Sequence, residues 1–269
     1  MSNWSSNTIK ANGIQLHYHR AGGAKPPLVL AHGITDTGLC WIRAAQVLQD
    51  DFDVIMVDAR GHGHSDKPET GYSPTDHAAD LAGLIEALGL EKPALMGHSM
   101  GAGSVATLAA GYPDLPGRIV LEDPPWRLAA NETEQDRRAG RDSWRQQIAD
   151  YKSKSRQELI DFGKQRSPAW DDIEFGPWSE AKQLVSPNVV EFIPHRRPWQ
   201  EIVPNIICPT LLVTADAELG AIVTSEVAQS VAQLNPNIRV AHIPGAGHNI
   251  RREQFAGFLE AVTAFLLDQ

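Results

Sequence analysis

Seven short apolar runs recur along the 269-residue chain, and most are separated by segments with helical patterning. The runs are IQLHYHR, PLVLAHG, DVIMVDA, PALMGHS, RIVLEDP, PTLLVTA and RVAHIPG. Helices are expected at about 40–49, 75–89, 100–111, 222–233 and 252–267. Short β-rich runs that alternate with helices predict an α/β fold: a mostly parallel sheet, covered by helices on both faces, with an antiparallel start.

The alternation stops between Pro124 and about Pro209, where charged helical stretches replace the strand-like runs. A segment of this length is not a simple loop in a compact domain. We therefore expect a helical cap, inserted after the sixth strand and lying over the C-terminal edge of the sheet. Residues 1–123 and 206–269 are expected to form the core, and 124–205 the cap. Five of the seven tryptophans lie in the cap segment: Trp126, Trp144, Trp170, Trp178 and Trp199.

Composition narrows the range of partners. The formal net charge of −9 and the isoelectric point near 5.5 predict no basic surface for nucleic acid or an anionic membrane. Cys40 and Cys208 are too few for a disulfide framework, and we expect buried thiols. The opening MSNWSSNTIK has no apolar signal core, and no run reaches the length of a membrane span. These features favour a cytoplasmic protein without a nucleic-acid or membrane partner, and they leave the oligomeric state open.

A serine stands where one apolar run meets a helix. Residues 97–101, GHSMG, match the pattern G-x-S-x-G, a strand-to-helix turn so tight that glycine is needed on both sides. Such a turn would expose Ser99 above the sheet as a nucleophile. The backbone N–H of Met100 would then lie at a helix N-terminus, where unpaired donors favour a developing negative charge. The backbone N–H of Ile34, after PLVLAHG, is the second candidate oxyanion donor.

Partners for this serine are found further along the chain. His248, in GAGHNIRREQF, lies in a glycine-rich loop before the last helix and is the expected general base. Carboxylates end two intervening strands, with Asp123 in LEDPPW and both Asp216 and Glu218 in LLVTADAELG. We favour Asp123 as the acid because Pro124 restricts the backbone beside it and so holds the carboxylate rigidly. Asp216 and Glu218 stay open as alternatives.

The segments LVLAHGIT, VDARGHGHSDKP, MGHSMG, LEDPP and PGAGHNI together resemble an α/β-hydrolase-fold serine hydrolase over nearly the whole chain outside the cap. The order serine, acid, histidine is that of the family. Members usually take the acid from the end of the seventh strand, and some take it from the end of the sixth. The resemblance implies acyl transfer by a Ser-His-acid triad without a cofactor. Ser99 excludes the dehalogenases and epoxide hydrolases of this fold, which use an aspartate nucleophile.

Two other kinds of site are less well supported. A dinucleotide site needs a third glycine after Gly61 and Gly63, but Asp66 occupies that position. The residues His62, His64 and Asp66 are similar to the opening of the H-x-H-x-D-H motif of metallo-lactonases, yet Lys67 replaces its last histidine. We therefore predict no bound metal.

The cap suggests the substrate class. An aromatic pocket above Ser99, lined by Trp126, Trp144, Trp178 and Ile250, would suit neutral, mainly apolar esters or lactones, N-acyl homoserine lactones included. No cation is placed by the sequence to bind a substrate carboxylate, and Arg196 and Arg197 are the nearest candidates. A C–C bond hydrolase or a thioesterase on the same scaffold is the alternative, as is a ligand receptor without catalysis.

Overall fold

The computed structural model describes residues 4–127, 134–195 and 197–268. An eight-stranded sheet has the order β1-β2-β4-β3-β5-β6-β7-β8. Strands β1 (Ser5–Ala11) and β2 (Ile14–Arg20) are antiparallel to each other, and β2 is antiparallel to β4. The others run parallel: β3 (Pro27–Ala31), β4 (Asp53–Val57), β5 (Ala94–His98), β6 (Arg118–Glu122), β7 (Thr210–Thr214) and β8 (Ile238–His242). The predicted fold class is confirmed.

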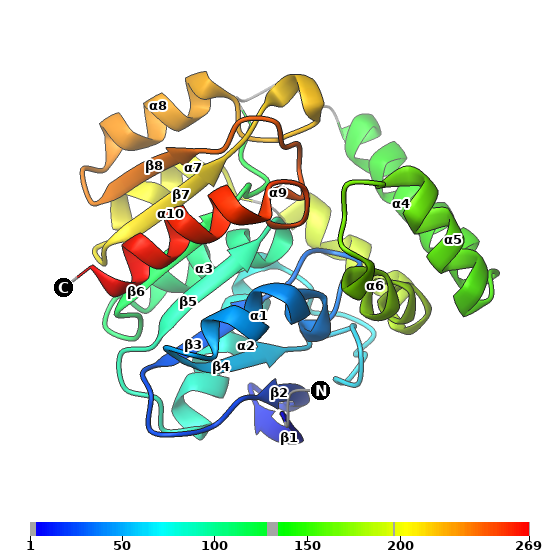
Figure 1. Cartoon of the computed structure of the whole chain (residues 1–269), viewed down its shortest axis with the longest axis horizontal. Helices are drawn as coiled ribbons and strands as arrows, with labels where there is room; N and C mark the ends of the chain where they lie inside the picture. The colour runs from blue at the N-terminus through cyan, green and yellow to red at the C-terminus, as the bar shows by residue number, and fades with distance from the viewer. Residues whose placement is uncertain (1–3, 128–133, 196, 269) are drawn as a thin grey trace.

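Helices cover both faces of the sheet, which explains why the central strands are apolar on both sides. One face packs against α1 (Ile42–Leu48) and α10 (Phe255–Leu267), which lie in front in Figure 1. The other packs against α2 (Pro74–Ala87), α3 (Met100–Gly111) and α8 (Ser225–Leu234). Short turns of helix occur at η1 (Gly38–Trp41), η4 (Ala217–Leu219) and α9 (Ile250–Glu253).

Six helical elements and no strand occupy the described residues between β6 and β7. They are α4 (Glu134–Lys152), α5 (Arg156–Arg166), α6 (Asp172–Leu184), η2 (Pro187–His195), α7 (Trp199–Ile202) and η3 (Val203–Asn205). Helices α4, α5 and α6 stand together at one end of the molecule in Figure 1. None of the described helices is long and apolar enough to cross a membrane.

Both ends of this inserted segment pack into the core. Trp126 is only 3% exposed and belongs to the hydrophobic cluster that includes α3, as do Trp199, Ile202 and Val203. The prediction that Trp126 lines a pocket is therefore wrong, because its ring fills space between the segment and the sheet. We propose that 124–205 is the cap, in which α6 packs against η1 and α1 of the core and α5 packs against α6.

Candidate active site

The turn after β5 holds Ser99 in a rare backbone conformation, with φ 52° and ψ −115°. Glycine on either side makes this turn possible. A Cβ on Gly97 would lie 2.5 Å from backbone atoms of Gly101 and Ala102, and a Cβ on Gly101 would collide with the carbonyl of Ala31. This strained backbone conformation directs the Ser99 side chain away from the carboxyl end of β5, as expected of a nucleophile.

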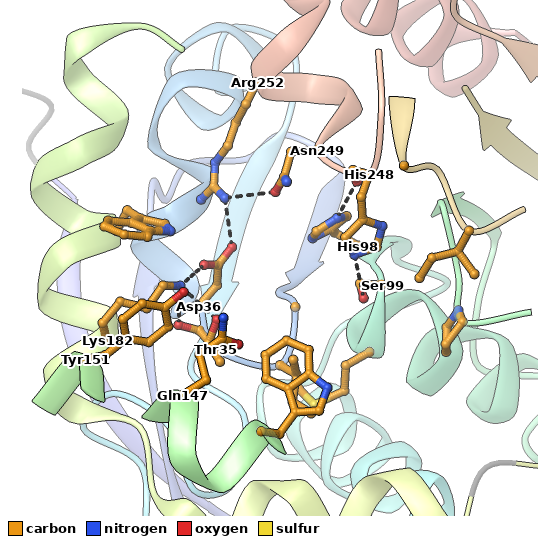
Figure 2. Close-up of a pocket in the computed structure, with 18 of the residues that line it drawn as sticks. Thr35, Asp36, His98, Ser99, Gln147, Tyr151, Lys182, His248, Asn249 and Arg252 are labelled. Carbon is orange, nitrogen blue, oxygen red and sulfur yellow. Dashed lines mark hydrogen bonds and ion pairs between the residues drawn. The ribbon is translucent and has the colours of Figure 1, made fainter. Parts of the chain in front are cut away.

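Three side chains from three separate loops form a continuous hydrogen-bond chain. The Nε2 atom of His248 lies 3.1 Å from Ser99 Oγ, and its Nδ1 atom lies 2.6 Å from Asp123 Oδ2. Since the carboxylate can only accept, Nδ1 carries the proton and Nε2 is the acceptor for the serine hydroxyl. Figure 2 shows His248 directed at Ser99.

The loop after β7 supports Asp123 rather than supplying the acid itself. Asp123 is fully buried, and its carboxylate accepts the backbone N–H groups of Ile222 and Val223 at 2.8 to 3.0 Å. Asp216 instead accepts from His242 Nε2 at 3.0 Å and from the backbone N–H of Gly245 at 2.7 Å. Glu218 is exposed on η4. Of the three candidate acids, the fold brings only Asp123 to His248.

The two predicted oxyanion donors are the backbone N–H groups of Met100 and Ile34. Met100 begins α3, whose first N–H groups have no intrahelical partner, and the Ser99 side chain does not cap this helix. Ile34 follows Gly33 in the loop after β3. This loop lies against the nucleophile, because a Cβ on Gly33 would be 3.6 Å from Ser99 Cβ. The N–H groups of Ile34 and Met100 therefore remain the predicted oxyanion donors.

His98 contacts the histidine loop, as a residue that shapes the turn would. Its Nε2 atom donates to the backbone carbonyl of His248 at 2.9 Å. Burial, followed by the charge of Arg251, holds the pKa of His98 well below its ordinary value. A neutral His98 ring therefore fixes the position of the loop that carries His248.

A pocket of about 460 Å³ opens above Ser99 and His248 and extends between α4, α5 and α6. Trp144 and Trp178 line it, as predicted from the sequence, and Tyr151, Trp170 and Phe192 add further aromatic wall. The prediction for Ile250 is wrong. Ile250 is the first residue of α9, and its side chain is fully buried in the hydrophobic cluster between the sheet and α10.

The pocket is more charged than the sequence suggests. Asp36, Lys182 and Arg252 lie together on one side of it (Figure 2), and Arg127 and Arg166 also line it. The predicted cations are elsewhere: Arg197 is exposed and pairs with Glu201, and Arg196 lies outside the described residues. The sequence GHNIRRE contains a signal for Arg252. Arg252 follows the candidate base His248 by four positions, and residues at this spacing on a helix lie on the same side.

The three residues of the possible metal motif do not converge. His62 is fully buried, and its ring nitrogens lie 2.8 Å from the carbonyl oxygens of Ile34 and Arg60. His64 is exposed, and Asp66 accepts the backbone N–H of Gln15. Among the described residues, no group of three or more histidine, cysteine or acidic side chains could hold a metal ion.

Chelation should therefore leave activity unchanged. Incubation with EDTA followed by gel filtration is expected to give the same hydrolytic rate as mock-treated protein, since no step of acyl transfer needs a metal ligand. The rate is measured on p-nitrophenyl acetate before and after dialysis against zinc. Loss of activity with EDTA, restored by zinc, would contradict this expectation.

Comparisons with known proteins identify the family of this chain. Residues 26–167 match the family model of the alpha/beta hydrolase fold. The chain is 31% identical to N-formylmaleamate deformylase of Pseudomonas putida over 96% of its own length and 95% of that protein. A crystal structure of E-2-(acetamidomethylene)succinate hydrolase superposes with a TM-score of 0.82, at 26% identity, over 98% of this chain and 99% of that one. A crystal structure of N-formylmaleamic acid deformylase from Pseudomonas putida has a TM-score of 0.82 at 25% identity, covering 96% and 100%. The chain is a hydrolase and belongs to the α/β-hydrolase fold family.

Proposed function

We propose that this hydrolase cleaves a small acyl compound through a covalent acyl-enzyme at Ser99. The observation that carries the proposal is the hydrogen-bond chain from buried Asp123 through His248 to Ser99 at the base of a 460 Å³ pocket. A nucleophile, a base within hydrogen-bond reach and a third group that orients the base are what such catalysis requires.

Each residue has a defined task in this mechanism. His248 Nε2 takes the proton as Ser99 Oγ attacks the substrate carbonyl, and the N–H groups of Ile34 and Met100 hold the oxyanion. The protonated His248 then gives its proton to the leaving group, the tetrahedral intermediate collapses, and the acyl group stays on Ser99. Water activated by His248 releases the acid. Asp123 keeps the imidazole in the required tautomer and stabilises its charged form without becoming protonated.

For the substrate we propose an acyl group on nitrogen in a small, carboxylate-bearing molecule. The names of the two relatives describe a formyl or acetyl group on nitrogen in a molecule derived from a dicarboxylic acid. Arg127 and Arg166 line the pocket here and can attract an anion. This differs from the neutral, mainly apolar substrates expected from the tryptophan content alone.

Esters and lactones are the second candidate class. They pass through the same tetrahedral intermediate, and the apolar wall formed by Ile34, Trp144 and Phe192 would suit an N-acyl homoserine lactone or a short-chain ester. C–C bond hydrolysis and thioester hydrolysis would use the same triad, so only measured rates separate these reactions. A ligand receptor would show none of them.

A substrate panel tests the proposed class. We expect kcat/KM for an N-formyl or N-acetyl compound with a carboxylate to exceed that of its methyl-ester analogue by about tenfold or more, because a charge-assisted hydrogen bond contributes about 1.5–3 kcal/mol. Arg166→Gln should remove most of this preference by raising KM for the anion. The matched control is Arg197→Gln, which changes an exposed arginine outside the pocket lining. Higher kcat/KM for neutral esters and lactones would contradict the N-acyl assignment and support the second class.

A further inference from the structure

Three successive carbonyl groups in the loop after β3, those of residues 33–35, each meet a buried side-chain nitrogen. His32 Nδ1 donates to the first at 2.8 Å, and His62 Nε2 lies 2.8 Å from the second. Lys182 Nζ donates to the third at 2.7 Å. The first two side chains come from the core, whereas Lys182 comes from α6 of the inserted segment. One element outside the core is therefore bonded directly to the loop of the oxyanion donor.

The bond from Lys182 reaches the Ile34 N–H through two peptide groups. A trans peptide directs its N–H opposite to its C=O. Lys182 holds the carbonyl of Thr35, which orients the N–H of Asp36 in the same peptide unit. That N–H donates to the carbonyl of Gly33 at 3.0 Å. The Gly33 carbonyl and the Ile34 N–H belong to the same peptide unit. Holding this carbonyl in place therefore sets the direction of the Ile34 N–H.

All three ammonium protons of Lys182 form hydrogen bonds to the loop after β3. Its ammonium donates to the Thr35 carbonyl, to Thr35 Oγ1 at 2.8 Å and to Asp36 Oδ1 at 2.9 Å, which uses all three protons. The residue is 2% exposed and lies 4.9 Å from the centre of the Trp178 ring. Burial lowers its pKa, and the negative charge of Asp36 opposes that shift. Lys182 has no proton left to donate to a substrate.

The charge of Lys182 belongs to a buried, balanced group. Asp36 also pairs with Arg252 at 3.1 Å and Arg251 at 3.5 Å, and these arginines pair with Glu174 and Glu122. Although burial opposes ionisation of Asp36, the three cations hold its pKa well below the ordinary value. Removing one member leaves a net buried charge, which is strongly destabilising, whereas removing an opposite pair keeps the balance.

We propose that Lys182 is a positioning residue for the oxyanion hole: by holding the Thr35 carbonyl, α6 of the inserted segment aims the Ile34 N–H at the developing oxyanion. The inference rests on the proposed serine mechanism. The positioning role predicts that replacing Lys182 lowers the stabilisation of the transition state and changes substrate binding little. It also predicts that this loss does not follow from reduced stability of the fold.

The test measures how fast a fluorophosphonate labels Ser99, because this reaction needs no knowledge of the physiological substrate. Ser99 Oγ bonds to phosphorus, the P–F bond breaks, fluoride leaves, and His248 accepts the serine proton. The phosphoryl oxygen occupies the oxyanion hole. We expect Lys182→Met to lower the labelling rate by about 10²-fold, the cost of one misplaced oxyanion donor. For p-nitrophenyl acetate, kcat should fall similarly while KM stays within about threefold.

Two further variants separate positioning from folding. Lys182→Met/Asp36→Asn keeps the buried charges balanced, so its unfolding temperature should lie closer to that of the parent protein while labelling stays slow. Should the single variant unfold, the double variant carries the test. Lys164→Met is the matched control, because Lys164 is an exposed lysine of α5 that pairs with Asp172 and contacts no part of the loop. It should label at the parental rate.

The outcomes distinguish the two proposals. Slow labelling in both Lys182 variants, with normal labelling in Lys164→Met, supports the positioning role. Parental labelling in a folded Lys182→Met protein, or recovery of labelling together with stability in the double variant, overturns it and leaves the triad mechanism intact. Failure of the parent protein to label at Ser99 overturns the proposed function, and the positioning role with it.

Discussion

Replacing Ser99 with alanine should lower kcat by about 10⁴- to 10⁶-fold, the range typical for loss of a catalytic serine. The Ser99 hydroxyl is the group that His248 Nε2 contacts, and every later step of the mechanism passes through its oxygen. The fold should survive, because the Ser99 side chain does not cap α3 and the backbone of the turn is held by other contacts, including Ser99 N–H to the Glu122 carbonyl at 2.9 Å. Turnover of p-nitrophenyl acetate and thermal unfolding give the two readouts.

Ser104→Ala is the matched control for this substitution. Ser104 lies one turn further along α3, is buried, and donates to the Met100 carbonyl at 2.9 Å. Its loss should cost about 1 kcal/mol of stability at most and leave kcat within about threefold, because a helical back-bond of this kind contributes little. A folded Ser99→Ala protein that keeps a tenth or more of the parental turnover would refute the triad mechanism.

Asp123→Asn should have the second largest effect, a fall in kcat of about 10³- to 10⁴-fold. An asparagine has the same size, but its amide NH₂ can donate to His248 Nδ1 and so favour the tautomer that cannot accept the Ser99 proton. The asparagine Oδ1 can still accept the Ile222 and Val223 N–H groups, which Asp123 Oδ1 accepts at 2.9 to 3.0 Å, and this orientation turns the NH₂ toward His248. Steady-state kinetics over a range of pH measures the loss.

The other two carboxylates provide the controls for the acid. Asp216→Asn and Glu218→Gln should each leave kcat within about tenfold, because neither side chain contacts His248 and such surface changes are usually small. If Asp123→Asn kept most of its activity while Asp216→Asn or Glu218→Gln lost orders of magnitude, the acid would be assigned to the loop after β7 instead.

The geometry of the triad follows from features that a sequence displays. Strands of a parallel sheet end at one edge, so residues just after apolar runs meet there even when they are far apart in the chain. Ser99 and His248 are 149 positions apart, yet their side chains lie 3.1 Å apart. Strand β1 could not be predicted in this way, because most of its side chains are exposed and its sequence contains no apolar run.

The direction of a side chain within the inserted segment is harder to predict. Trp126 lies in the segment after β6 and Trp178 lies within α6; Trp126 packs into the core, whereas Trp178 lines the pocket. A large aromatic residue gains from burial in either place, so its identity alone does not choose between them.

The buried pair of Lys182 and Asp36 has no local signature in the sequence. Lys182 and Asp36 are 146 positions apart, and each resembles an ordinary surface residue in its own segment. Charged side chains are almost never buried unless paired, so the sequence favours exposure for each one taken alone. The pair can be identified only from the fold, which places α6 against the loop after β3.

The covalent intermediate at Ser99 is the most direct test of the proposed chemistry. The protein is mixed with p-nitrophenyl acetate, quenched in acid during the first turnovers, digested, and analysed by mass spectrometry. The predicted result is one acetyl group on the peptide that contains Ser99, absent from Ser99→Ala protein and present in Ser104→Ala protein. Hydrolysis at the parental rate with the Ser99 peptide unmodified, or with the acetyl group on another residue, would contradict the mechanism.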